Sequence, residues 1–139
     1  MSTTPGISPA HIRVRDVMHA GIVTCEPETS MRVVARLMAE HRVHAVAVAD
    51  PSLRGRHQGV ISDLAVAAAI ATGTERTAAA SAVAEPVTVS SDDRLDHAAQ
   101  LMVEHELTHL IVLDPASGHP VGVLSTLDLA AVYGNGAVD

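Results

Sequence analysis

The apolar positions of this chain recur every three or four residues in two separate stretches, and this spacing predicts two amphipathic helices. The positions are Val33, Val34, Leu37 and Met38 in the first stretch, and Leu95, Ala98, Leu101 and Met102 in the second. Polar residues that can cap a helix stand before each stretch, Thr29 or Ser30 in one and Asp92 or Asp93 in the other. We therefore expect each helix to begin just after these residues.

Short β-rich runs flank each predicted helix. Extended segments at 22–24 and 87–89 come before the helices, and the runs HAVAVA and HLIVL, each ended by Asp-Pro, come after them. A second strand then begins at Gly59 or Gly122 and leads directly into a further helix. The order of elements is therefore β-α-β-β-α, written twice.

The two halves form an internal repeat. Thr24 corresponds to Thr88 and Met38 to Met102 at the same offset, and Gly-Val-Ile-Ser from Gly59 corresponds to Gly-Val-Leu-Ser in the second copy. Because neither copy has enough sheet to bury both of its faces, we expect an α/β (α+β) fold in which two β-α-β-β-α repeats pack around a pseudo-two-fold axis.

The same pattern predicts how the chain is divided. We expect a flexible N-terminal tail at 1–12, a first repeat at 13–71, a linker at 72–84, a second repeat at 85–133 and a C-terminal tail at 134–139.

The second copy carries the polar residues of most chemical interest, Ser125, Thr126 and Asp128, at the expected start of its last helix. Free backbone N–H groups and the helix dipole favour an anion there, and a hydroxyl can add a bond to a phosphate oxygen. Asp128 can accept two hydrogen bonds, which suits the hydroxyls of a ribose, and Gly122 allows a close approach of a neighbour or ligand. These residue types are also ordinary N-caps, and the local stretch alone favours capping.

The first copy keeps the serine, Ser62, but has Ala65 where the second copy has Asp128. Asp63 follows Ser62 directly, so it should face another side of its helix. We therefore expect one competent site per chain.

Composition narrows the ligands and partners. The chain has no Phe, no Trp and one Tyr, so aliphatic side chains must build the core and enclose any flat ligand. The formal net charge of −7 argues against non-specific binding to nucleic acid or to an anionic membrane. A single cysteine, Cys25, without a basic neighbour is expected to be unreactive and suits a reducing compartment. With neither a signal peptide nor an apolar run long enough to span a membrane, we expect a cytoplasmic protein.

The two copies together resemble a tandem cystathionine-β-synthase (CBS) domain pair, or Bateman module. Each copy is a β-α-β-β-α unit that reads Gly-apolar-apolar-Ser near its end, and the second continues to Asp128. The segment Val14-Arg15-Asp16-Val17-Met18 resembles the V-x-D-V-M sequence found at the start of such pairs. Many members have Pro in the middle strand, where this chain has Ala47 and Ile111. The resemblance covers residues 13–133.

This resemblance implies a stand-alone regulatory, energy-sensing module that binds AMP, ADP, ATP or a related adenosyl compound in a cleft between the repeats. It implies no required cofactor, a homodimer as a disc of four repeats, and an unidentified protein effector. The ligand-binding residues that it implies are Asp128, Ser125, Thr126, Gly122, Leu124, Met18, Ile22, Val23, Thr108, His109 and Leu110. His109, Arg54, Arg56 and His119 are alternative cations for the phosphates.

Two other functions remain as alternatives. A structural or dimerisation module without ligand is favoured by Ala65 and opposed by Asp128. An enzyme is the least favoured, because no acid, base and nucleophile can be grouped. The sequence His105-Glu106-Leu107-Thr108-His109 matches the zinc-protease motif H-E-x-x-H, which requires both histidines on one helix. Here we expect the helix to end near His105 and a strand to follow, so we expect no metal site.

Overall fold

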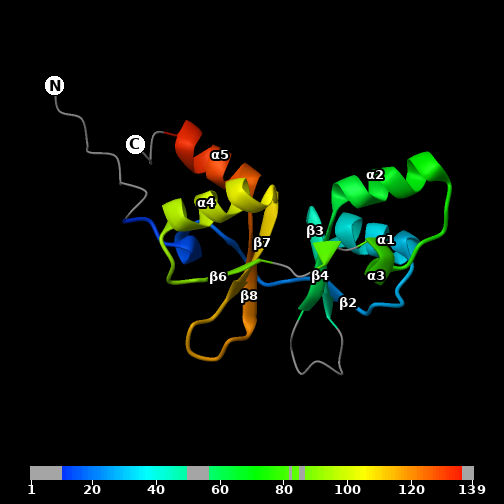
Figure 1. The fold of residues 1–139 in the computed structure, drawn as a ribbon, viewed down its shortest axis with the longest axis horizontal. Helices are drawn as coiled ribbons and strands as arrows, with labels where there is room; N and C mark the ends of the chain where they lie inside the picture. Colours follow the sequence, from blue (N-terminus) through cyan, green and yellow to red (C-terminus); the bar gives the residue numbers. More distant parts are fainter. Residues whose placement is uncertain (1–10, 50–56, 82, 85–86, 136–139) are drawn as a thin grey trace. The chain divides into compact units, whose positions relative to one another are not determined.

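The structure of the chain is a computed structural model, and it describes residues 11–49, 57–81, 83–84 and 87–135 (Figure 1). The chain divides into two compact units. Unit 1 comprises residues 1–21 together with 87–139, and unit 2 comprises Ile22–Pro86. No helix in the described ranges is both long enough and apolar enough to cross a membrane.

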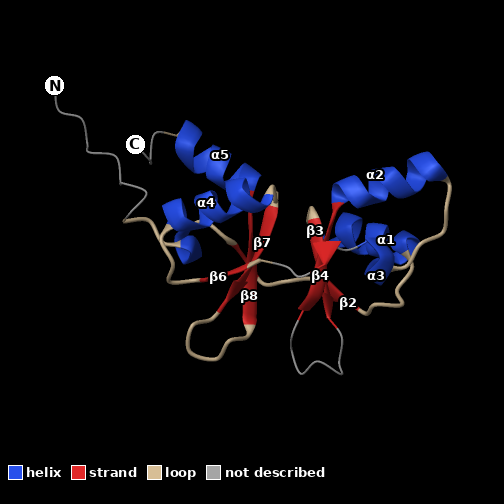
Figure 2. Ribbon diagram, viewed as in Figure 1, coloured by secondary structure: helices blue, strands red, loops and turns tan. Residues whose placement is uncertain are grey.

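Unit 2 is a four-stranded sheet whose helices pack on one face (Figure 2). Its strands lie in the order β2-β3-β4-β5; β2 runs parallel to β3, and the other pairs are antiparallel. Its elements are β2 Thr24–Cys25, α1 Met31–His41, β3 Ala45–Ala49, β4 His57–Ser62, α2 Asp63–Thr72, α3 Ala78–Ser81 and β5 Val83–Ala84.

Unit 1 has the same architecture, with strand order β1-β8-β7-β6 and a parallel β6/β7 pair. Its elements are the 3₁₀ turn η1 Val14–Asp16, β1 His19–Ala20, β6 Thr88–Ser90, α4 Leu95–His105, β7 His109–Leu113, β8 Pro120–Ser125 and α5 Thr126–Gly134. The predicted order β-α-β-β-α is therefore confirmed in both copies. The last helix begins at Thr126, among the polar residues where we expected its start.

One edge strand of each unit comes from a segment outside the copy that forms the rest of that unit. In unit 1, β1 pairs antiparallel with β8, so that His19 faces Val123 and Ala20 faces Gly122. In unit 2, β5 pairs in the same way with β4. Residues 13–21, which the sequence repeat groups with the first copy, therefore fold with the second. The expected linker likewise contributes α3 and β5 to unit 2.

Each unit has its own aliphatic core between the helices and the sheet. The core of unit 2 comprises Cys25, Met31, Val34, Met38, Val46, Val48, Ile61 and Ala78. The core of unit 1 comprises Ile12, Val14, Val89, Leu95, Ala98, Met102, Leu110, Val112 and Leu124. Burying each large aliphatic side chain contributes about 1.5–3 kcal/mol, so these cores dominate the stability of the two units. Val33, which we expected on the apolar face of α1, is 38% exposed and does not belong to this core.

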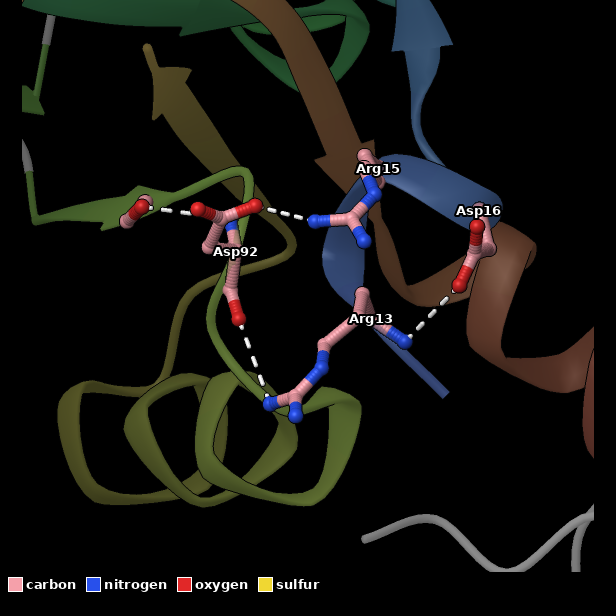
Figure 3. A network of polar contacts seen from close by, with 5 residues as sticks. Arg13, Arg15, Asp16 and Asp92 are labelled. Carbon is pink, nitrogen blue, oxygen red and sulfur yellow. Dashed lines mark hydrogen bonds and ion pairs between the residues drawn. The ribbon is translucent and has the colours of Figure 1, made fainter. Parts of the chain in front are cut away.

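The segment before β1 is anchored to the β6–α4 loop of unit 1. The backbone N–H of Val14 donates to Asp93 O at 2.9 Å, and that of Leu95 donates to Ile12 O at 2.9 Å. Figure 3 shows the polar contacts around this anchor, in which the guanidinium groups of Arg13 and Arg15 both reach Asp92. Because Ile12 and Val14 are also buried, the segment is part of the unit 1 fold.

One capping prediction is confirmed and one is wrong. Ser30 is the N-cap of α1, and its side chain accepts a hydrogen bond from the Val33 N–H. The N-cap of α4 is Arg94 instead of Asp92 or Asp93. The two carboxylates have other partners, since Asp92 pairs with Arg15 and Asp93 accepts from the Ser90 N–H at 2.9 Å.

The end of α4 explains why the H-E-x-x-H sequence is not a helical metal motif. The helix ends at His105, as we expected, and the next residue, Glu106, has φ 53 in the left-handed region. His109 is the first residue of β7. The two histidines therefore do not share a helix face.

Candidate functional site

Asp128 and Ser125 hold each other at the N-terminus of α5. The Ser125 side chain accepts from the Asp128 N–H at 3.1 Å, and the Asp128 Oδ2 accepts from the Ser125 N–H at 2.8 Å. This reciprocal pair is a capping box, and it satisfies two backbone donors that the helix itself leaves free. Within unit 1, the two side chains therefore cap the helix, as the local sequence alone favoured. It also fixes the carboxylate of Asp128 in one orientation.

The second oxygen of this carboxylate faces an exposed histidine. The Nε2 atom of His19, on β1, lies 2.9 Å from Asp128 Oδ1. The Asp128 side chain is only 10% exposed, whereas the His19 side chain is 78% exposed. Asp128 therefore does not point into bulk solvent, and His19 is the outer member of the pair.

Gly122 allows this pair to form, because it lets β1 lie directly against β8. A Cβ atom at Gly122 would lie 2.4 Å from the backbone oxygen of His19 and 2.8 Å from the Met18 sulfur. Both distances are well below van der Waals contact. The close approach that we expected at this glycine is therefore to the chain's own β1 strand.

Three further predicted residues lie beside the capping box. Thr126 begins α5, has an exposed side chain and donates its backbone N–H to Thr108 O at 3.0 Å. The Thr108 hydroxyl lies 2.9 Å from the Nδ1 atom of His109, which in turn pairs in register with Ser125. The end of β8 and the beginning of β7 thus bring hydroxyl, imidazole and carboxylate groups to the same end of the unit 1 sheet.

The predicted aliphatic residues of unit 1 differ in how deeply their side chains are buried. Leu110 and Leu124 are opposite each other in the β7–β8 pair and are fully buried in the core of unit 1. Their side chains offer no surface to a ligand and instead support the strands that carry the polar groups. Met18 is partly buried against the same core.

Ile22 and Val23 belong to unit 2. Both are partly buried, and the backbone oxygen of Val23 accepts from the Ala47 N–H at 2.9 Å. Unit 1 therefore brings together nine of the eleven predicted residues, counting the two buried leucines, while Ile22 and Val23 lie in the other unit.

The corresponding position in unit 2 has different chemistry. Ser62 is the N-cap of α2 but makes no side-chain capping bond, and Ala65 packs against the core where unit 1 has Asp128. The Asp63 carboxylate lies 3.0 Å from Nδ1 of His44, so it is directed to the beginning of β3. At this position unit 2 therefore has no carboxylate held by a backbone N–H, in contrast to Asp128 of unit 1.

The candidate phosphate-binding cations are only partly described. His119 is exposed in the β7–β8 loop, where its backbone oxygen accepts from the Asp114 N–H at 2.8 Å. Arg54 and Arg56 lie outside the described residues. His19, a cationic candidate in its own right, was missed by sequence reasoning. Its only sequence signal is its place directly after Val-Arg-Asp-Val-Met, and the β1–β8 pairing is what brings it to Asp128.

Two groups outside this site have shifted acidity. Burial raises the pKa of the Cys25 thiol, which fits the unreactive cysteine that we expected. The hydroxyl of Ser117 donates to Asp114 at 2.8 Å, and this bond lowers the pKa of the Asp114 carboxyl. Neither group contacts Asp128 in the described residues.

A surface cavity of about 370 Å³ lies in unit 2, near the C-terminal end of α2. Its lining includes Met31, Ala35, Val66, Ala69 and Ile70, with Arg32, Glu75 and Arg76 among its charged residues. The cavity contains none of the residues that the sequence predicts for ligand binding. We therefore base the functional argument on unit 1.

Comparison with known proteins gives a consistent family match. The chain matches the CBS domain family over residues 14–72 and 80–135. It is 28% identical over 127 residues to a homoserine O-acetyltransferase of Methanosphaerula palustris, a match that covers 91% of this chain and 25% of that protein. The chain thus spans about a quarter of the length of this curated relative.

Three solved structures share the fold. The CBS domain pair of protein MJ0100, in complex with 5′-methylthioadenosine and S-adenosyl-L-methionine, has a TM-score of 0.78 at 21% identity, covering 89% of this chain and 97% of that chain. The CBS domain protein PAE2072 from Pyrobaculum aerophilum, complexed with AMP, has a TM-score of 0.77 at 27% identity, covering 91% and 98%. CBSX2 in complex with AMP has a TM-score of 0.67 at 23% identity, covering 88% and 96%.

Proposed function

Because the chain belongs to the CBS domain family and carries two CBS domains in tandem, we propose that it is a regulatory module that binds an adenine nucleotide or a related adenosyl compound. AMP, ADP and ATP are the first ligands to test. The AMP complex of PAE2072, at 27% identity, supports this ligand class. We assign the module no reaction and no required cofactor.

The observation that carries the proposal is the state of the Asp128 carboxylate. Its Oδ2 is held by the Ser125 N–H, and its Oδ1 faces an exposed side chain that can move. A carboxylate oriented in this way can accept hydrogen bonds from ribose hydroxyls without first losing side-chain freedom. The N-terminus of α5 favours the negative charge of a phosphate nearby.

The other residues have supporting roles in this proposal. Thr126, Thr108 and His109 supply polar groups at the same end of the unit 1 sheet, and Met18, partly buried against the core of that unit, supplies an aliphatic contact for the adenine. Gly122 holds β1 against β8, while Leu110 and Leu124 support the strands from the core. Because Ala65 replaces the aspartate in the first copy, we propose one ribose-binding site per chain.

We also propose that two copies of the chain associate. The equivalent helices of the two units, α2 and α5, expose large apolar side chains at corresponding positions: Leu64 and Ile70 on α2, and Leu127 and Tyr133 on α5, each at least 65% exposed. A second copy would cover such surfaces, which small soluble domains rarely leave open. Analytical ultracentrifugation tests this, and a monomer at micromolar concentration would contradict it. We propose a protein effector as a further partner, and co-purification tests this.

The binding test compares the parent chain with Asp128→Asn. Asn keeps one acceptor for the Ser125 N–H, so it preserves much of the cap while removing the charge and the second carboxylate oxygen. A ligand at 100 times its Kd should add about 2.7 kcal/mol to the free energy of unfolding of the parent chain. Asp128→Asn should lose most of this gain, and the control Asp63→Asn should keep it.

The alternative function is a packing module without ligand. It is favoured if AMP, ADP, ATP and S-adenosyl-L-methionine all leave the melting temperature of the parent chain unchanged. Turnover of any of these compounds, detected by chromatography of the incubated nucleotide, would contradict both binding and packing as sufficient descriptions.

A further inference from the structure

The contact between His19 and Asp128 occupies the acceptor that a ribose hydroxyl requires. An ionised carboxylate only accepts hydrogen bonds, so a bond across the 2.9 Å between Nε2 and Oδ1 needs a proton on Nε2. The other oxygen, Oδ2, is already engaged by the Ser125 N–H. In the described unit both oxygens of Asp128 therefore have partners, and only one of these partners is an exposed, movable side chain.

The two units differ at both members of this pair. In unit 1, His19 stands opposite Val123 on the edge strand, and Asp128 stands in the first turn of the following helix. In unit 2, Val83 holds the register position of His19, opposite Val60, and Ala65 holds that of Asp128. The imidazole thus stands on the edge strand of the unit that has the carboxylate, whereas an aliphatic residue stands there in the unit that lacks it.

We propose that His19 competes with the ligand for Asp128. In the free protein its imidazole N–H fills Oδ1, and a ligand ribose binds only when His19 swings away from that oxygen. This inference rests on the proposed function, because it assigns to His19 the control of access to the same carboxylate. His19 then lowers the affinity of the site for every ligand that uses a ribose hydroxyl.

The size of the effect follows from exposure. Because His19 is 78% exposed, its pair with Asp128 is in contact with water and is weak. Removing an exposed pair of this kind corresponds to a change of about two- to fivefold in an equilibrium constant. The competitor therefore tunes affinity without preventing binding.

The test is the Kd of AMP, measured by titration calorimetry, for the parent chain and three variants. His19→Ala should bind AMP about two- to fivefold more tightly than the parent chain. His19→Gln can still donate an N–H to the carboxylate and should restore an affinity close to that of the parent. His97→Ala removes another exposed histidine of unit 1, from α4, and should leave the Kd unchanged.

Two outcomes separate this inference from the proposed function. If the parent chain binds AMP and His19→Ala binds AMP with equal or lower affinity than the parent, His19 does not compete with the ligand, and the proposed function stands. If neither chain binds any of the adenosyl compounds, both are wrong. Nitrogen chemical shifts of the His19 ring give a second readout, because saturating AMP should remove the signature of a hydrogen-bonded Nε2.

Discussion

Replacing Gly122 by alanine tests whether the close approach of β1 to β8 organises unit 1. The new Cβ would lie 2.4 Å from the His19 backbone oxygen, a contact that no side-chain rotation can relieve. The strand β1 must therefore move away from β8. This movement costs the hydrogen bonds of a two-residue strand pair and the bond from the Gly21 N–H to Val121 O at 2.8 Å.

The expected loss has two parts. Overpacking a tight contact costs about 1–3 kcal/mol, and each backbone hydrogen bond that is lost costs about 1 kcal/mol. With partial relaxation of the strand, we expect Gly122→Ala to lower the free energy of unfolding by about 2–4 kcal/mol. The separation of β1 from β8 should also break the contact between His19 and Asp128.

Urea unfolding followed by circular dichroism measures this loss, since the chain has no Trp to report by fluorescence. Hydrogen exchange at the Gly21 amide reports whether β1 has left the sheet. Gly134→Ala is the matched control: it has no atom within 4 Å of the added Cβ and lies at the end of α5, so alanine should be neutral or stabilising. A Gly122→Ala protein that unfolds within about 0.5 kcal/mol of the parent, with an equally protected Gly21 amide, would refute the reasoning.

Three further predictions address the anchor and the two shifted groups. Val14→Ala should lower the free energy of unfolding by about 2 kcal/mol, because Val14 is fully buried in the core of unit 1; a loss below about 0.5 kcal/mol in urea would show that the segment is dispensable. Cys25 should react slowly with a thiol reagent at neutral pH, because burial raises its pKa, and reaction at the rate of the urea-unfolded chain would contradict this. Ser117→Ala should raise the pKa of Asp114, measured by carbon NMR, because the Ser117 hydroxyl of the parent chain stabilises the ionised carboxylate. The hydroxyl bond stabilises the parent protein above the pKa that Asp114 has in the unfolded chain, and this contribution is lost as the pH falls through the lower pKa of the folded state. An unchanged Asp114 titration would show that the hydroxyl is not its main partner.

The pattern of apolar residues was sufficient to predict the helices α1 and α4 and most of the strands. The spacing of Val34 and Met38 has a direct counterpart in the buried face of α1, and the run HLIVL forms β7 as expected. These predictions succeed because the period of a helix or strand determines which side chains share a face. The short elements η1, β1, α3 and β5 were not predicted, because each has only two to four residues and none belongs to the pattern that the two copies share.

The capping residues show the limit of local reasoning. Ser30 caps α1 as predicted, yet the equivalent carboxylates before α4 are engaged elsewhere, Asp92 by Arg15. Arg15 is distant in sequence from Asp92, and no local pattern specifies that the two meet. A polar side chain can cap a helix only when tertiary contacts do not already engage it.

By itself, the sequence determined the tandem repeat, the β-α-β-β-α order and the difference between Asp128 and Ala65, because these follow from residue types and their spacing. Only the tertiary structure decided that the segment before β1 folds with the second copy, and that His19 meets Asp128 there. The reason is that the position of an edge strand depends on the backbone hydrogen bonds and the close packing that the neighbouring strand offers, here beside Gly122. The two residues of β1 do not specify this position by themselves.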